Sequence, residues 1–194
     1  METSNILPKD GLVIYSGAVM SPNAADEFYR KLFSQIDWQP DEVMMFGKHI
    51  TTKRKVAWFG DEEFTYTYSK VRKKACVWIP VLHEIKKIAE AVSGENFNSC
   101  LLNLYHSGAE GMGWHTDGER ELKENGTIAS LSFGAERTFQ FRHKLSGELV
   151  SIWLENGSVL QMKGETQRYW QHRLPVATKV KSPRINLTFR TIVR

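Results

Sequence analysis

The segment Arg184-Ile185-Asn186-Leu187-Thr188-Phe189-Arg190 alternates strictly between polar and apolar residues. A period of two predicts a β-strand with one polar and one apolar face, within a strand that we expect over residues 184–192. Further short apolar runs precede it, separated by Gly, Ser, Glu or Pro: 100–105, 127–133, 137–142, 149–154, 158–162 and 172–176. Many short strands at near-regular spacing indicate a sandwich or jelly roll.

The N-terminal part of the chain adds two helices and a few strands. Apolar residues recur at helical spacing over 24–36, where Ser21 is placed to cap the helix, and over 81–92, after Pro80. We expect strands over 43–50 and 56–59, joined by a basic turn, and another over 64–68. No linker, repeat or low-complexity tract is found. The sequence therefore predicts a single α+β, mainly β domain over residues 1–194, a jelly roll with its N-terminal helices packed on one face.

Composition excludes several classes of protein. The chain has 194 residues, a formal charge of +4, and two cysteines, Cys76 and Cys100, which we expect to be buried thiols rather than a disulfide. No apolar run is long enough to span a bilayer, and the first residues lack the pattern of a secretory signal. We expect an intracellular protein, cytoplasmic or, in a eukaryote, nuclear. We also expect it to be a monomer.

His115 and Asp117 are two residues apart, so on extended backbone their side chains point to the same face. His172 comes much later and is able to return on another strand. Two imidazoles and one carboxylate form the facial triad that holds Fe(II) and leaves positions open for other ligands. The alternative interpretation is a surface His-x-Asp pair and an unrelated histidine, and the pair alone would favour that alternative.

The alternating strand offers a complementary site for an anion. Arg184, Asn186, Thr188 and Arg190 share one face, and Asn103 and Tyr105 alternate in the same way just before the metal loop. Arginines inside a sheet structure are costly unless they pair with anions, and guanidinium binds carboxylate in a bidentate fork. A dicarboxylate such as 2-oxoglutarate fits this requirement. Alternation alone would favour the alternative, a half-exposed strand with a polar outer face.

Taken together, these motifs resemble the AlkB family of Fe(II)- and 2-oxoglutarate-dependent dioxygenases, and more closely its members that repair duplex DNA. The resemblance covers about residues 40–193. Its motifs are Asn103-Leu104-Tyr105, His115-Thr116-Asp117, Ile128-Ala129-Ser130-Leu131-Ser132-Phe133-Gly134, His172, and Arg184 to Arg190.

The resemblance implies a double-stranded β-helix and specific roles for residues in most of these motifs. His115, Asp117 and His172 would bind iron. Arg184 would hold the distal carboxylate of 2-oxoglutarate and Arg190 would lie near the other. The residues that complete this cradle would be Asn103, Tyr105 and Asn186.

The resemblance also implies the reaction. N-alkylated bases such as 1-methyladenine and 3-methylcytosine would be demethylated oxidatively with O2, releasing formaldehyde, succinate and CO2. The substrate would be DNA, with RNA as the alternative. A base in a duplex would have to be extruded from the stack before it could react.

Residues 40–75 are similar to the nucleotide-recognition segments of the family. Aromatic and basic residues alternate there, a composition that suits bases and phosphates. Phe46 would fill the gap left in the stack, and Trp58, unless it packs in the core, and Tyr66 would offer stacking surfaces. The expected phosphate contacts include Lys48 and Arg54, together with Lys55 and 72–74.

The chain departs from the family pattern next to the metal motif. After the first metal histidine the family often has a basic or polar residue, and here it is Thr116. After the metal aspartate it often has an acidic residue, and here it is Gly118. These differences leave the lesion preference open. Glu119 matches the acidic position that reads the damaged base.

Two other functions remain open at this stage. One is a 2-oxoglutarate-dependent oxygenase that acts on a protein or a small molecule, against which the basic and aromatic segment 46–74 argues. The other is a nucleic-acid-binding module that has lost its metal, against which the complete set of three ligands argues.

Overall fold

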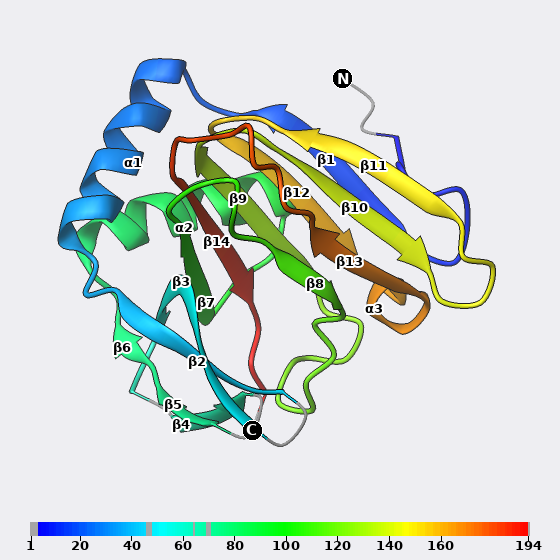
Figure 1. Ribbon diagram of the computed structural model, residues 1–194, viewed down its shortest axis with the longest axis horizontal. Helices are drawn as coiled ribbons and strands as arrows, with labels where there is room; N and C mark the ends of the chain where they lie inside the picture. Colours follow the sequence, from blue (N-terminus) through cyan, green and yellow to red (C-terminus); the bar gives the residue numbers. More distant parts are fainter. Residues whose placement is uncertain (1–3, 46–47, 64, 69–70, 194) are drawn as a thin grey trace.

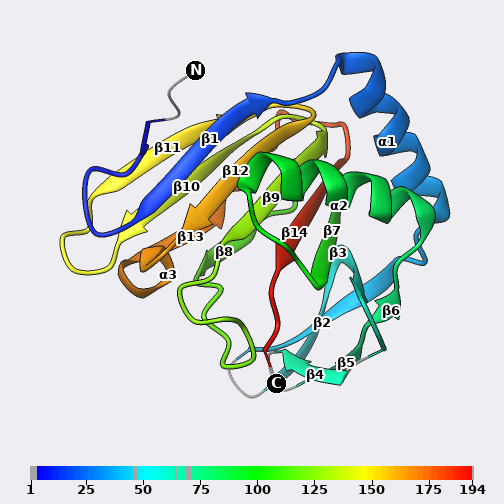
Figure 2. The ribbon, with the colours of Figure 1, turned by 180° about the vertical axis from the view of Figure 1, so that it is seen from behind.

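The computed structural model describes residues 4–193 except 46–47, 64 and 69–70, and only the backbone of residues 43–45, 48–50, 65–68 and 71–74. Two β-sheets face each other, and the helices α1 and α2 lie on the outer face of the larger one, as Figures 1 and 2 show from opposite sides. The mainly β architecture with helices on one face, as the sequence predicted, is confirmed.

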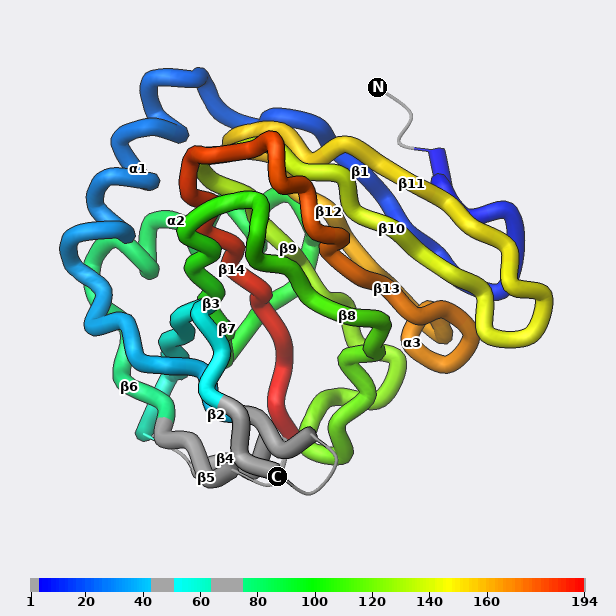
Figure 3. The backbone as a smooth tube through the Cα atoms, in the orientation of Figure 1, coloured from blue at the N-terminus to red at the C-terminus, as the bar shows by residue number. Residues whose placement is uncertain are grey.

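The larger sheet joins strands from all parts of the chain, and all its neighbours on the main path are antiparallel. β1 and β12 lie side by side although they come from opposite ends of the chain (Figure 3). The strands in spatial order are β1 (Leu12–Ala18), β12 (Ser158–Lys163), β9 (Ile128–Gly134), β14 (Arg184–Arg190), β7 (Ser99–Tyr105), β3 (Lys48–Gly60) and β2 (Gln39–Met45), with β6 (Cys76–Val77) parallel to β3.

The smaller sheet has four strands, and a separate two-stranded hairpin lies beyond the larger sheet (Figure 1). The four strands in order are β11 (Leu149–Leu154), β10 (Arg137–His143), β13 (Trp170–Leu174) and β8 (Met112–His115). The hairpin consists of β4 (Thr65–Tyr68) and β5 (Val71–Lys74).

Both predicted helices are present. α1 (Pro22–Gln35) begins after Ser21, whose hydroxyl accepts a hydrogen bond from the backbone N–H of Ala24. α2 (Pro80–Ser93) begins with the proline itself and ends at Gly94 in the left-handed conformation. A third, single-turn helix, α3 (Thr166–Tyr169), leads into β13. None of the helices in the described chain is both long and apolar enough to cross a membrane.

Two apolar clusters hold these layers together. One lies between α1, α2 and the larger sheet and includes Leu32, Ile85, Phe133 and Phe189, all fully buried. The other lies between the two sheets around Phe141 and Trp170. The space between the sheets is therefore filled toward one end of the sandwich, and the polar cavity described below opens near the other.

Three predictions about the N-terminal half are wrong. The strand expected over 43–50 is divided between the end of β2 and the start of β3, which pair antiparallel. No basic turn separates 43–50 from 56–59, because β3 runs without interruption from Lys48 to Gly60 through Lys53-Arg54-Lys55. Its pairing with both β2 and β7 keeps these charged residues extended. Cys76 is exposed, whereas Cys100 is buried as expected. The strands β1, β5, β6 and β8 were not predicted.

Candidate active site

The three presumed iron ligands converge at the open edge of the smaller sheet. β8 pairs with β13 so that His115 and His172 lie directly opposite each other, and their ring centroids are 4.3 Å apart. β8 ends at His115, and Asp117 follows in the loop. Among the described residues, these three form the one group of potential metal-ligating side chains close enough to share an ion, with ligand atoms within 4.8 Å of one another.

The geometry fits a single metal ion. Nε2 of His115 lies 3.8 Å from Oδ1 of Asp117, and Nε2 of His172 lies 3.9 Å from the same oxygen. Two metal–ligand bonds of roughly 2 Å each can span such distances. Nδ1 of His115 lies 2.8 Å from the carbonyl oxygen of Gly113, which accepts its hydrogen. This hydrogen bond leaves the lone pair on Nε2 to face the ion.

The electrostatics prepare the ligands for a cation. Burial lowers the pKa of His172 to about 3, with His115 and Arg190 acting in the same direction and Asp117 opposing them. The imidazole is therefore neutral at neutral pH. Burial alone would raise the pKa of Asp117, but Arg190 above all, together with the two neighbouring histidines, outweighs it and holds that pKa below its ordinary value. Arg190 also donates a 2.7 Å hydrogen bond to Oδ2 of Asp117, which leaves Oδ1 toward the histidines.

The alternating face of β14 lines the same cavity as the three ligands. Arg184, Asn186, Thr188 and Arg190 all point into it from β14, and Asn103 and Tyr105 from β7. The cavity has a volume of about 530 Å³, including the part open to solvent. The structure thus brings every residue proposed for metal and co-substrate into one site.

Arg184 is a buried cation, and among the described residues no carboxylate forms an ion pair with it. Its side chain donates 2.9 Å to the hydroxyl of Ser132 and lies 5.7 Å from the Tyr105 ring, and its Nε has no hydrogen-bond partner. Burial lowers its pKa to about 10; Tyr105 opposes this shift, and Arg137 adds to it. The side-chain amide of Asn103 lies in the same cavity, and its N–H groups are able to donate to an anion. Such a site is stabilised by an anionic ligand with hydrogen-bonding oxygens, so the residues fit 2-oxoglutarate.

Supporting residues emerge only from the fold. Ser130 and Ser132 on β9 accept hydrogen bonds from Asn186 and Arg184, and Gln167 accepts one from the backbone N–H of Asp117. The register of β9 against β14 brings these hydroxyl groups under the cradle. No local sequence signal marks Gln167.

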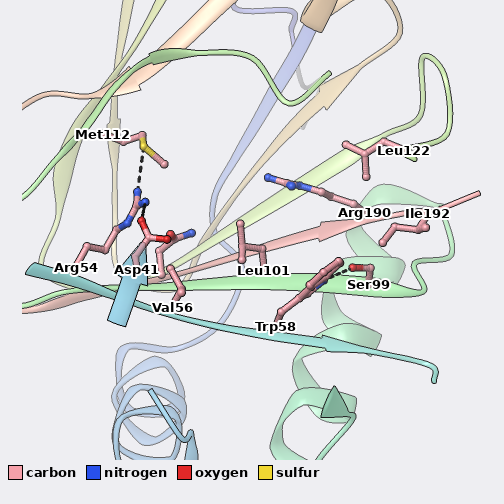
Figure 4. Close-up of a pocket in the computed structure, with 11 residues that line it drawn as sticks. Asp41, Arg54, Val56, Trp58, Ser99, Leu101, Met112, Leu122, Arg190 and Ile192 are labelled. Atoms are coloured by element: carbon pink, nitrogen blue, oxygen red, sulfur yellow. Dashed lines mark hydrogen bonds and ion pairs between the residues drawn. The ribbon is translucent and has the colours of Figure 1, made fainter. Parts of the chain in front are cut away.

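A second hollow lies beside the metal cavity, between β3, β7 and the end of β14 (Figure 4). Trp58 lines it, but the side chain is 9% exposed and its indole N–H donates 2.7 Å to the hydroxyl of Ser99. Arg54 lines it too. This arginine is 5% exposed and pairs with the buried carboxylate of Asp41 and the sulfur of Met112.

The burial of Arg54 corrects one prediction. A guanidinium that is buried and already paired with a carboxylate is not available at the surface, so the expectation that Arg54 contacts a phosphate is wrong. Arg54 forms a wall of the hollow instead.

The remaining substrate residues are placed only in part. Glu119 lies beside Arg190, with 3.9 Å between Oε1 and the guanidinium, and its Oε2 is buried without a hydrogen-bond partner. Phe46 lies outside the described residues. The side chains of Lys48 and Tyr66 also lie outside them.

The sequence model of the 2OG-Fe(II) oxygenase superfamily matches residues 11–190. The human DNA oxidative demethylase ALKBH2 is 41% identical over 180 residues, covering 87% of this chain and 69% of that protein. The chain belongs to the AlkB family of 2OG-Fe(II) oxygenases. Accordingly, it is an Fe(II)- and 2-oxoglutarate-dependent dioxygenase, and the site described above fits both groups.

Other relatives of this AlkB-family chain are similar over the same region. The bovine DNA oxidative demethylase ALKBH2 is 41% identical over 87% of this chain. The human alpha-ketoglutarate-dependent dioxygenase alkB homolog 3 is 38% identical over 92% of it. The chain spans 65% of the length of each of these two relatives.

The fold agrees with a solved member of the family. The structure of OsALKBH1 superposes with a TM-score of 0.62, covering 95% of this chain and 98% of that one at 16% sequence identity. This likeness confirms the jelly-roll architecture of the AlkB-family chain.

Proposed function

We propose that this protein is a nucleic acid repair enzyme that removes N-alkyl groups oxidatively from DNA bases such as 1-methyladenine and 3-methylcytosine. The observation that carries the proposal is the single cavity in which His115, Asp117 and His172 converge beside the buried, anion-seeking Arg184. The relatives named DNA oxidative demethylase, at about 40% identity over most of this chain, support DNA as the substrate.

The residues have distinct roles in this proposal. His115, Asp117 and His172 would hold Fe(II), with Arg190 orienting the carboxylate of Asp117. Arg184 would bind the distal carboxylate of 2-oxoglutarate. The rest of the molecule would be positioned by Asn103, Tyr105, Asn186 and Arg190. When bound, iron with 2-oxoglutarate and O2 supplies the oxidation that hydroxylates an N-methyl group, with formaldehyde, succinate and CO2 as the products. The chain itself orients the groups and excludes water.

The substrate side of the proposal rests on charge and shape. A methylated base such as 3-methylcytosine is cationic, and the buried, unpartnered Oε2 of Glu119 would attract it. Trp58 would form one wall of the adjoining hollow. Within the recognition segment 40–75, Phe46 would act as a wedge in the stack, Tyr66 as a stacking surface and Lys48 as a phosphate contact. We further propose a monomer that acts in the nucleus or cytoplasm.

Formaldehyde release tests the function directly. Purified protein with Fe(II), 2-oxoglutarate and O2 is offered oligonucleotides that carry 1-methyladenine or 3-methylcytosine, as single- and double-stranded DNA and as RNA. We expect stoichiometric formaldehyde and restored bases from DNA. Protein that binds iron and 2-oxoglutarate but releases no formaldehyde from any of them would contradict the proposal and favour a protein or small-molecule substrate.

A further inference from the structure

The outer face of the smaller sheet carries an ordered set of polar side chains, and no helix of the described chain covers it. Figure 1 shows this sheet in front, on the side opposite to α2. Residues directly opposite each other on neighbouring strands share a face. The register therefore places Gln140 beside Arg173 and Arg142 beside Gln171 on this outer face, while Phe141 and His172 form the inner pair.

Two arginines on this face share one aromatic ring. The guanidinium carbon of Arg142, on β10, lies 4.5 Å from the centre of the Trp114 ring, and that of Arg173, on β13, lies 4.4 Å from it. Each arginine also donates a 2.8 Å hydrogen bond across the strands, Arg142 to Gln171 and Arg173 to Gln140. We call Arg142, Trp114 and Arg173 the arginine–tryptophan platform.

The charges of the platform are held in place without being neutralised. The partners of both guanidinium groups are neutral amides and an indole ring, and within the described chain no carboxylate lies within ion-pair distance of either. Each arginine side chain is held by stacking on the Trp114 ring and by one hydrogen bond to a glutamine amide oxygen. This order reduces the conformational entropy that the side chain would lose on binding a ligand. Both arginines and the tryptophan remain partly exposed. Two pre-positioned cations at a solvent-facing surface complement a polyanion.

The platform is the reverse side of the metal site. Trp114 immediately precedes His115, and Arg173 immediately follows His172. Trp114 and Arg173 therefore point to the opposite face of β8 and β13 from the two iron-binding histidines. β8, which carries Trp114, is the edge strand of its sheet. A strand of nucleic acid whose base enters the cavity thus reaches the platform by passing this edge.

We propose that the arginine–tryptophan platform binds the phosphodiester backbone of the nucleic acid next to the extruded base. The inference rests on the proposed function, because it takes the substrate to be a nucleic acid. Arg142 and Arg173 donate to phosphate oxygens, which positions the substrate without reading its sequence. Trp114 keeps both guanidinium groups ordered.

The test compares two double variants that remove the same net charge. Arg142→Gln/Arg173→Gln removes both cations of the platform. Arg30→Gln/Lys87→Gln removes two exposed cations from α1 and α2, on the far side of the larger sheet. Affinity for an unmodified duplex is measured by fluorescence anisotropy between about 50 and 200 mM salt. Arg142→Lys/Arg173→Lys is included because it keeps the charge and the bulk.

We expect the platform glutamine variant to bind duplex at least about 10-fold more weakly at low salt. We also expect the slope of log affinity against log salt to become shallower by about 1.8, the value for two lost phosphate contacts at 0.9 each. The lysine variant keeps most of the slope, and the α1/α2 variant binds like the unaltered protein. Equal losses in the two glutamine variants would overturn the platform, because net charge alone would then explain binding.

Turnover separates this inference from the proposed function. With a long methylated duplex, the KM of the platform glutamine variant rises much more than it does with a methylated trinucleotide, which is too short to reach past the edge of β8. Similar changes in KM for both substrates would overturn the platform. Absence of formaldehyde from the unaltered protein with every substrate would contradict the proposed function, whereas the binding series would still decide the platform.

Discussion

The contact between Arg190 and Asp117 is the residue-scale feature on which the metal site depends most. One carboxylate oxygen accepts from the guanidinium at 2.7 Å, so the other oxygen faces the two histidines. Partners of this kind orient metal ligands, and their loss typically reduces affinity 10- to 100-fold. Arg184, in contrast, is a buried cation that forms no ion pair with a carboxylate in the described part of the chain, and its role depends on the co-substrate.

Arg190→Met should therefore weaken Fe(II) binding by roughly 10- to 100-fold without removing a ligand. The affinity is measured by anaerobic titration calorimetry. Arg168→Met, at an exposed arginine that pairs with Glu165, is the control. Unchanged affinity in Arg190→Met would show that Asp117 does not need this partner.

Arg184→Met should have opposite effects on the protein without and with 2-oxoglutarate. Removing a buried, unneutralised charge leaves the melting temperature of the ligand-free protein unchanged or higher. Loss of the carboxylate partner costs about 2 to 5 kcal/mol of binding, roughly 30-fold or more in Kd. The stabilisation that 2-oxoglutarate gives in thermal melts with Mn²⁺ in place of Fe²⁺ should therefore be lost. A lower melting temperature of the ligand-free variant would show that Arg184 stabilises the fold itself.

At the scale of elements, the register of β14 between β7 and β9 builds the co-substrate cradle. Arg184 pairs with Gly134 at the end of β9, where the chain turns with φ +80°. A Cβ at Gly134 would lie 2.7 Å from the carbonyl oxygen of Pro183. Glycine is required at this position because the backbone is left-handed and the carbonyl oxygen of Pro183 leaves no room for a Cβ.

Gly134→Ala should accordingly destabilise the protein by about 1 to 3 kcal/mol. The measurement is urea denaturation followed by circular dichroism. The matched control is Gly113→Ala, because a Cβ at Gly113 meets nothing within 4 Å. If the two variants unfolded at the same urea concentration, the close approach at Gly134 would not constrain this end of β14.

The elements also show what the sequence could and could not predict. Strict alternation was enough to place the four polar residues of β14 on one face, because the period of a strand is a local property. The path of β3 was not predictable in this way. In the sequence, its basic residues resemble a turn. In the structure, Arg54 can lie in a buried strand because Asp41, on the neighbouring strand, pairs with it. That contact depends on an irregular register between β2 and β3 near Pro40, which no local pattern reveals.

The hydroxyl groups beneath the cradle were missed for a similar reason. Ser130 and Ser132 belong to a motif identified in the sequence, but their role was not predictable because it depends on which strand lies beside β9. The metal ligands were predictable because their residue types are rare together and their chemistry is specific. Cys76 is exposed although free cysteines are usually buried. Residue type alone therefore did not predict its position.

At the scale of the whole molecule, one continuous strand, β3, ties the recognition segment to the larger sheet. β3 pairs with β7 in the larger sheet along one half and with β2 along the other. A boundary between independent domains would have to break this strand. We therefore predict that residues 40–75 unfold with the rest of the chain.

This prediction is checked by guanidinium denaturation monitored with two signals. Tryptophan fluorescence and far-UV circular dichroism should give the same midpoint, as expected for a cooperative transition. Two separate midpoints would contradict the single-domain interpretation.

The central claim is that His115, Asp117 and His172 hold one ferrous ion beside 2-oxoglutarate. Anaerobic titration of the protein with Fe(II) and 2-oxoglutarate, followed by visible absorption, tests it most directly. The account predicts a weak charge-transfer band that saturates at one iron per chain and is absent in His115→Ala. A band of undiminished intensity in His115→Ala, in protein shown to be folded, would contradict the account.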